Sequence, residues 1–186
     1  MREHLQKNLS EMGDLLPRLA ALAGPLHEAG RAMLACWGKR GKVLTAGNGG
    51  SAADALHLAE ELTVRFQKHR RALAALALLD ATAMSCAGND LGYAEVFARQ
   101  VEALGNPGDV LVVFSTSGNS ESVVRAVARG KEQDMVTVAF LGRDGGKLRG
   151  RCDVDLIVPS DTTHHIQEAH ELLFHTLCQW IDDQVD

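Results

Sequence analysis

From Lys42 onward, short apolar runs alternate with longer segments of mixed polarity. Five runs have the length of β-strands, and most are rich in Val and Leu: KVLTAG, ALAALALL, DVLVVFS, MVTVAFLG and VDLIVPS. The intervening segments predict helices over about 51–65, 93–104 and 119–132, a shorter one near 144–150, and a last one over about 163–184. Near-continuous apolar strands that alternate with helices predict an α/β protein whose parallel sheet is covered on both faces.

The first 40 residues predict two helices that precede the sheet. The apolar positions of the first recur at steps of four and three, as in a helix that packs against another helix: Leu5, Leu9, Met12, Leu16 and Leu19. Pro17 is expected to tighten or break this helix, and a second helix is expected over about 25–37. Because both precede the first strand, we expect them to form an arm or an oligomer surface outside the central sheet.

Composition and charge narrow the class of protein. The 186 residues suffice for one domain, and with 46% hydrophobic but only 4% aromatic residues the core must consist mainly of Leu, Ala and Val. A formal charge of −5 without a basic block argues against non-specific binding to nucleic acid. The chain has no apolar run long enough to span a membrane, and its polar start, MREHLQKNLSEM, lacks the apolar stretch of a secretory signal. Four well-separated cysteines (Cys36, Cys86, Cys152 and Cys178) are expected to be reduced structural thiols, so we expect a cytoplasmic protein.

Two of the predicted strands end in unusual loops. The first strand runs into GNGGSAADA, where Gly47, Gly49 and Gly50 surround Asn48 and Ser51 opens a helix. Glycines let backbone N–H groups approach an anion, and a helix N-terminus favours negative charge. The third strand runs into STSGNSES, whose hydroxyls are those of Ser115, Thr116, Ser117 and Ser120. Since ligands bind beyond the carboxyl ends of parallel strands, the two loops suggest a phosphate cradle.

Other interpretations of these loops remain open. Gly47, Gly49 and Ala52 also fit a dinucleotide-binding GxGxxA pattern, with Asp80 as a possible ribose-binding acid, but that match alone is weak. No GK[ST] follows the glycines, which excludes a Walker A loop. The serine-rich loop is also compatible with an ordinary capped turn between strand and helix.

Two helices carry imidazole and carboxylate groups on their polar faces. In the helix after the first loop, His57 and Glu61 lie one turn apart, opposite an apolar stripe, so they could share a metal or pair a base with an imidazole. A solvated charged pair is the plainer alternative. The last helix presents a similar face and an opposite buried stripe: His164, Gln167, Glu171 and His175, against Ile166, Ala169, Leu173, Leu177 and Trp180. His170 borders the stripe and is expected to be packed and hydrogen-bonded, while His164 and His165 are expected to be solvated.

These segments together resemble one family. GNGGSAADALHLAEEL, GNDLGYAEVF, VEALGNPGDVLVVFSTSGNS, GRDGGKL and IQEAHELLFH, in this order, look like the phosphoheptose isomerases of the sugar-isomerase-domain (SIS) superfamily. The resemblance implies one domain over 1–186, with 1–40 for oligomer packing and 41–186 as a sugar-phosphate-binding core. It implies a flavodoxin-like three-layer α/β/α sandwich around a five-stranded parallel sheet, assembled as a homotetramer with active sites between subunits. The implied reaction converts sedoheptulose 7-phosphate to D-glycero-D-manno-heptose 7-phosphate, the first step toward bacterial heptose-containing glycans.

The same resemblance implies which residues act. It makes Glu61 and His175 the expected catalytic pair. The implied zinc ligands are His57, Glu61, Gln167 and His175. The implied substrate contacts are Asn48, Gly49, Gly50, Ser51, Glu61, Asn89, Asp90, Ser115, Thr116, Ser117, Ser120 and Gln167.

The spacing of two of these zinc ligands conflicts with a regular helix. Gln167 and His175 are separated by roughly 12 Å along a helix axis. Two ligands of one ion need donor atoms only about 4 Å apart. From spacing alone, Glu171, one turn from each, is the better candidate.

Two other functions compete with catalysis. Some relatives are adaptors that bind the replication initiator protein and lack the catalytic carboxylate and the late histidine. This chain keeps Glu61 and His175, which favours an isomerase that works through an enediol. Sugar-phosphate sensors usually carry an appended DNA-binding domain, and we expect no room for one in these 186 residues.

Overall fold

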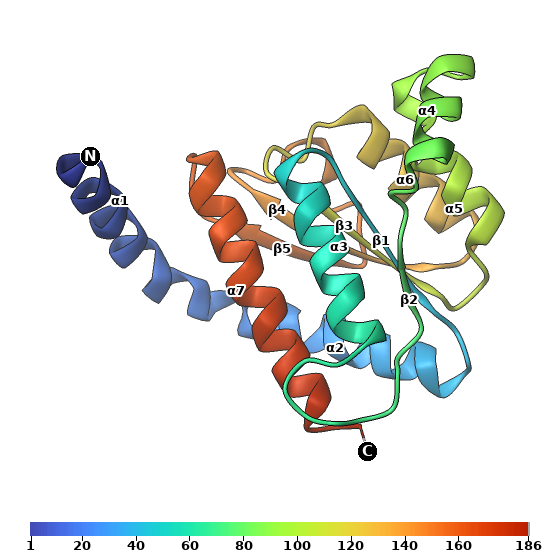
Figure 1. Ribbon diagram of the computed structural model, residues 1–186, viewed down its shortest axis with the longest axis horizontal. Helices are drawn as coiled ribbons and strands as arrows, with labels where there is room; N and C mark the ends of the chain where they lie inside the picture. Colours follow the sequence, from blue (N-terminus) through green and yellow to red (C-terminus); the bar gives the residue numbers. More distant parts are fainter. Residues whose placement is uncertain (186) are drawn as a thin grey trace.

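A five-stranded parallel sheet lies at the centre of the computed structural model, which describes residues 1–185 (Figure 1). The strand order is β2-β1-β3-β4-β5, and all neighbouring strands are parallel. The strands are β1 (Val43–Gly47), β2 (Ala75–Ala77), β3 (Val110–Ser115), β4 (Val136–Gly142) and β5 (Val154–Val158). The predicted five-stranded parallel sheet is therefore confirmed.

Helices cover both faces of this sheet, as predicted. One face carries α2 (Ala23–Gly38), α3 (Gly50–Thr63) and α7 (Thr163–Asp182); the other carries α4 (Ala81–Asp90), α5 (Ala98–Leu104) and α6 (Glu121–Glu132). Strand β3 contributes side chains to the hydrophobic cores on both faces of the sheet. Its Val112 and Phe114 pack in the first core, and Leu111 and Val113 pack in the second.

The region around β2 differs from the prediction. Of the eight-residue run ALAALALL, only three residues pair with β1, and Leu76 at this sheet edge is 47% exposed. The run is apolar because the flanking Leu73 and Leu78 are buried in the two cores. Helix α4 was not predicted, and the expected helix over 93–104 is divided into the 3₁₀ turn η2 (Tyr93–Glu95) and α5.

The N-terminal segment changes from an α-helix to a tighter 3₁₀ helix at Pro17, as expected. Helix α1 (Arg2–Leu15) gives way to the 3₁₀ segment η1 (Leu16–Leu22), and α1 projects from the body of the protein as an arm (Figure 1). Its Leu5 and Leu9 are exposed. Helix α2 is not an arm, because Met33 and its neighbours pack in the core against β3 and β5.

One buried histidine ties α1 to α7. The Nδ1 atom of His165 lies 2.7 Å from Glu168 Oε2, and its Nε2 atom lies 3.0 Å from Glu11 Oε2. The expectation that His165 is solvated is wrong, since its side chain is only 2% exposed. The hydrogen bond with Glu168 raises the pKa of His165, burial opposes this, and Glu11 raises it further. The contact therefore stabilises the fold most below the ordinary histidine pKa and weakens as the pH rises through the raised value.

His170 is packed and hydrogen-bonded, as predicted, and gives a testable pH dependence. It is fully buried, its Nε2 atom lies 3.0 Å from the Leu141 carbonyl oxygen, and burial lowers its pKa from 6.5 to about 4. Between these two values the unfolded chain binds a proton that the native protein does not, so acidification should cost stability, up to about 3 kcal/mol. Urea unfolding of the wild type at several pH values should show this loss.

The His170→Gln variant should lack that part of the slope. His165 does not confuse the comparison, because its raised pKa contributes a slope only above about pH 6.5. Equal slopes for wild type and variant between pH 6.5 and 4 would contradict a neutral buried His170.

The structure also tests the expectations for the cysteines and for membrane-spanning helices. All four cysteines are free thiols; Cys36 and Cys178 are buried, Cys152 is partly buried, and Cys86 is exposed on α4, so the structural role expected for all four does not fit Cys86. Within residues 1–185, none of the helices combines the length and the apolar character needed to cross a bilayer.

Candidate active site

Helices α3 and α7 lie side by side on one face of the sheet and bring two polar faces together (Figure 1). The apolar stripe of α3, which includes Leu58 and Leu62, is buried in the same core as Leu173 and Leu177 of α7. The residues opposite these stripes therefore meet along the outer side of the helix pair. The two His/carboxylate faces therefore lie beside each other, an arrangement that the sequence alone did not establish.

His57 is the centre of this meeting point. Its Nε2 atom lies 3.2 Å from Glu61 Oε1 and 3.5 Å from His175 Nε2, while its Nδ1 atom lies 3.5 Å from Glu171 Oε1. Aromatic rings fix the two imidazoles: His57 packs edge-on against Phe174 at 5.2 Å between ring centroids. The two catalytic candidates, Glu61 and His175, thus flank one imidazole from opposite helices.

The donor set suits a divalent metal. His57, Glu171 and His175 can each offer a ligand atom within 4.8 Å of the others, and so can His57, Glu60 and Glu61. Two imidazoles with a carboxylate are a common zinc set, so these residues fit the implied metal. The Glu171 alternative from helix spacing is the one that appears beside both histidines.

Gln167 lies in the first turns of α7, nearer the N-terminus of the helix than Glu171 and His175. A β-carbon added to Gly50 would stand 2.3 Å from Gln167 Nε2, so this amide packs directly on the start of α3. Gln167 therefore reaches the first loop, where the sequence predicts a substrate contact. A side chain at position 50 would require the end of the Gln167 side chain to move.

Asp54 belongs to this face, although the sequence analysis did not identify it. It precedes His57 and Glu61 at helical spacing, and that spacing is the signal that could have revealed it. Its Oδ2 atom is buried without a hydrogen-bond partner within the described chain. Burial raises the pKa of Asp54 to about 7, the charge of Glu171 raises it further, and His57 partly offsets both. A carboxyl group that titrates near neutrality thus borders the candidate site.

Arg70 is a second residue that the sequence analysis missed. Its guanidinium donates to the backbone carbonyls of Glu61 at 2.8 Å and Leu62 at 3.0 Å, and its Nε atom donates to Asp182 Oδ1 at 2.7 Å. This buried pair joins the end of α3 to the end of α7.

In the first loop, the side chain of Asn48 is fixed by two hydrogen bonds. Gly49 has φ +57°, a conformation that favours glycine, and Asn48 donates from Nδ2 to Ser122 Oγ at 2.9 Å. The hydroxyl of Tyr93 donates to Asn48 Oδ1 at 2.8 Å, a contact that the sequence did not reveal. Ser51 is buried beneath the loop at 4% exposure. The loop is therefore preorganised by residues from β1, η2 and α6.

The second loop is a turn in which two serine hydroxyls accept hydrogen bonds from backbone amides. The Oγ atom of Ser115 accepts from the Gly118 amide at 3.1 Å, and that of Ser117 accepts from the Asn119 amide at 3.2 Å. Within residues 1–185, neither the Thr116 hydroxyl nor the Ser120 hydroxyl takes part in a hydrogen bond. A capped turn and a ligand cradle are thus compatible in this segment.

Gly118 shows how tightly this turn is built. It has φ +62°, and a β-carbon there would stand 1.9 Å from the Gly145 carbonyl oxygen. The turn therefore packs against the segment after β4, and a larger residue at this position would displace it.

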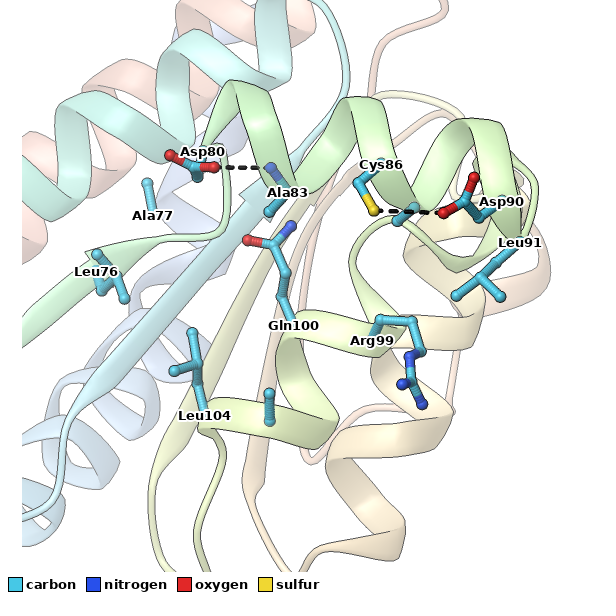
Figure 2. A pocket seen from close by; sticks show the side chains of 12 residues that line it. Leu76, Ala77, Asp80, Ala83, Cys86, Asp90, Leu91, Arg99, Gln100 and Leu104 are labelled. Carbon is cyan, nitrogen blue, oxygen red and sulfur yellow. Dashed lines mark hydrogen bonds between the residues drawn. The ribbon is translucent and has the colours of Figure 1, made fainter.

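Asn89 and Asp90 lie apart from the His57 group. They end the exposed helix α4, and Asn89 donates to Asp90 at 2.7 Å. A cavity of about 550 Å³ lies between this helix, α5 and the β2 edge, with mainly apolar walls (Figure 2). Asp90, a predicted substrate contact, and Asp80, the possible ribose-binding acid, both line it, and Cys86 donates to the Asp90 carboxylate at 3.5 Å.

Comparison with known proteins identifies the family of this chain. The SIS domain family matches residues 9–142. The phosphoheptose isomerase of Campylobacter jejuni subsp. jejuni serotype O:6 is 47% identical over 180 residues, covering 96% of this chain and 97% of the relative. The solved structure of phosphoheptose isomerase GmhA from Neisseria gonorrhoeae superposes with a TM-score of 0.93 at 44% identity, covering 98% of each chain. That of a phosphoheptose isomerase from Francisella tularensis gives 0.94 at 36% identity, covering 97% of each. The chain therefore belongs to the phosphoheptose isomerase family of SIS-domain proteins.

Proposed function

We propose that this chain converts sedoheptulose 7-phosphate to D-glycero-D-manno-heptose 7-phosphate through an enediol, the first step toward bacterial heptose-containing glycans. The observation that carries the proposal is the group formed by Glu61, His57 and His175 between α3 and α7. Relatives of nearly the same length, 47% identical to this chain, are named phosphoheptose isomerases. The adaptor alternative is not favoured, because both catalytic candidates are present and close to one imidazole.

Aldose–ketose isomerisation moves a proton between two adjacent carbons. In our proposal, Glu61 removes the proton from the carbon next to the carbonyl and returns it to the neighbouring carbon. His175 exchanges the proton of the substrate oxygens on the facing side. The contact of His57 with Glu61, at 3.2 Å, and the bonds from Arg70 to the Glu61 and Leu62 carbonyls hold this part of α3 in place.

The loops at the strand ends would bind the distal phosphate. Backbone N–H groups at Gly49 and Gly50 open α3, and the free hydroxyls of Thr116 and Ser120 lie at the end of β3 and the start of α6. Asn48, Ser51, Ser115, Ser117, Asn89, Asp90 and Gln167 complete the proposed substrate contacts. Binding at the phosphate end would orient the reacting carbons without contributing to the proton transfer itself.

A zinc ion is part of the proposal. His57, Glu61, Gln167 and His175 would hold it, and the position of Glu171 beside the two histidines adds a fifth candidate. When bound, zinc would polarise the substrate carbonyl and favour the negative charge of the enediolate. The proton transfers assigned to Glu61 and His175 depend on their own positions.

We also propose a cytoplasmic homotetramer whose active sites lie between subunits. The side chains of His57 and Glu171 are 38% and 50% exposed, so the site is open on the outer side of the α3–α7 pair. Chemistry through an enediol benefits from the exclusion of water, and a neighbouring subunit could cover this side. The exposed Leu5 and Leu9 of the α1 arm favour the same kind of assembly.

The direct test is an NMR assay with sedoheptulose 7-phosphate and protein of known metal content. Formation of an aldoheptose phosphate is the expected result. The absence of turnover by a metal-loaded, correctly assembled protein would reject the isomerase. A pull-down for protein partners would then test the adaptor function.

A further inference from the structure

Three segments that carry proposed substrate contacts are joined by one chain of hydrogen bonds. The hydroxyl of Tyr93 donates to Asn48 Oδ1 at 2.8 Å, and Asn48 Nδ2 donates to Ser122 Oγ at 2.9 Å. Tyr93 begins the 3₁₀ turn η2, which follows the end of α4 at Asp90. Ser122 lies in the first turn of α6, directly after the second loop with its Ser120. The side-chain amide of Asn48 therefore lies where the first loop, the second loop and the end of α4 meet.

The two hydrogen bonds determine how the Asn48 side chain is oriented. A side-chain amide offers two donors on its nitrogen and two acceptor sites on its oxygen. Ser122 accepts from the nitrogen and Tyr93 donates to the oxygen, so one N–H of Asn48 has no partner within the described chain and is available to a substrate oxygen. Loss of the bond to Tyr93 would leave the amide held at one end only, free to rotate and to turn its oxygen toward an anionic ligand.

The position of Tyr93 does not depend on its own hydroxyl. Gly92, just before it, has φ +90°, a conformation that favours glycine and redirects the chain after α4. Glu95 in the same turn forms an ion pair with Arg125 of α6, which fastens η2 to that helix. The Tyr93 side chain is 57% exposed, so it contributes little to the core. Removal of the hydroxyl alone should therefore change the bond to Asn48 and leave the turn in place.

We propose that Tyr93 is a positioning residue for sugar-phosphate binding, which acts by orienting the side-chain amide of Asn48 at the junction of the three segments. Tyr93 acts through Asn48 and needs no contact with the substrate. The inference rests on the proposed function in that it takes a sugar phosphate as the ligand of the two loops. It adds to that proposal a residue outside the proposed substrate contacts.

The test is a double-mutant cycle on the affinity for sedoheptulose 7-phosphate. Equilibrium dialysis gives an apparent dissociation constant whether or not the bound sugar is isomerised. Tyr93→Phe keeps the ring and removes the hydroxyl, and it should weaken binding by roughly threefold to tenfold, the usual effect of one lost hydrogen bond. In an Asn48→Ala background the same change should alter the affinity by less than twofold, because the group that Tyr93 orients is gone.

Thr63→Val is the matched control, because it also removes an exposed hydroxyl that donates to a single acceptor, the Ala75 carbonyl at 3.0 Å. This variant should bind the sugar phosphate like the wild type, and thermal unfolding should show that all variants fold. Three results would overturn the proposal: affinity of Tyr93→Phe within twofold of the wild type, equal losses in the two backgrounds, or a wild type that does not bind the sugar phosphate.

The proposed function can fail separately. A wild type that binds sedoheptulose 7-phosphate but does not isomerise it would reject the isomerase, and the same cycle would still support or overturn the role of Tyr93.

Discussion

Replacing Glu61 with Gln is expected to lower kcat by about 10²–10⁴-fold, the usual contribution of a positioned general base. The amide keeps the size of the carboxylate but cannot accept the substrate proton. The side chain is only 15% exposed and lies 3.2 Å from His57, so the change should leave the packing of α3 and α7 intact. Turnover is measured by NMR with sedoheptulose 7-phosphate, and the fold by thermal unfolding.

Glu60→Gln is the control for this experiment. Glu60 belongs to the same group of carboxylates but is exposed, so its replacement makes the same change in charge without removing the proposed base. A small effect of Glu60→Gln together with a large effect of Glu61→Gln, at equal zinc content of the two variants, would identify proton transfer as the function lost. Near-normal turnover in Glu61→Gln would exclude Glu61 as the base.

The largest expected effect on stability comes from Asp182→Asn. The Nε atom of Arg70 donates to Asp182 Oδ1 at 2.7 Å, and both side chains are only 1% exposed. Oδ2 of Asp182 accepts from the Gln67 and Lys68 amides, at 2.9 and 3.0 Å. Breaking a buried pair leaves the arginine charge uncompensated and should lower the free energy of unfolding by about 3–5 kcal/mol, measured by urea denaturation at neutral pH.

The adjacent residue provides a matched control. Asp183 pairs with Lys68 at the surface, where both side chains are more than half exposed, so Asp183→Asn should cost less than about 1 kcal/mol. Equal losses for the two variants would mean that burial does not determine the strength of the Arg70–Asp182 pair.

The Asp182 carboxylate also makes the free energy of unfolding depend on pH in strong acid. Burial alone would raise the pKa of Asp182, but hydrogen bonds from the Lys68 amide and Arg70 outweigh it and hold the pKa below its ordinary value. The stabilisation is therefore complete above the unfolded-state pKa of about 3.9 and is lost as the pH falls through the lower native value. The difference between wild type and Asp182→Asn should stay constant at neutral pH and shrink only in strong acid.

The sequence predicted the sheet well because its strands are buried on both faces. The five residues VLVVF of β3 are all apolar, and no other common element of that length has this pattern. Helix α4 was missed because it is built from small residues and buries only Ala87, so it lacks an apolar stripe. Its one clear signal was Asp80, whose side chain accepts from the Ala83 amide as a helix cap.

The candidate site was predictable only to the level of single helices. Helical spacing placed His57 with Glu61 and identified Glu171 on α7, because neighbours on one helix face follow directly from the chain. Spacing along the chain cannot show which turn of α7 lies beside His57, because that depends on how the two helices pack. Arg70 and Asp182, separated by 112 positions, form their pair only in the folded chain.

The pairing of α3 with α7 also sets when the site can exist during synthesis. Helix α3 ends at Thr63 and α7 begins at Thr163, so the partner of the His57 face is translated one hundred residues later. At bacterial elongation rates of about 5–20 residues per second, the ribosome needs roughly 5–20 s to supply it. Throughout that interval the apolar stripe of α3 and the imidazole beside it lack their cover. A pause or truncation before α7 would therefore leave a nascent chain with most of its sheet strands, no active site and an exposed core surface that chaperones would recognise.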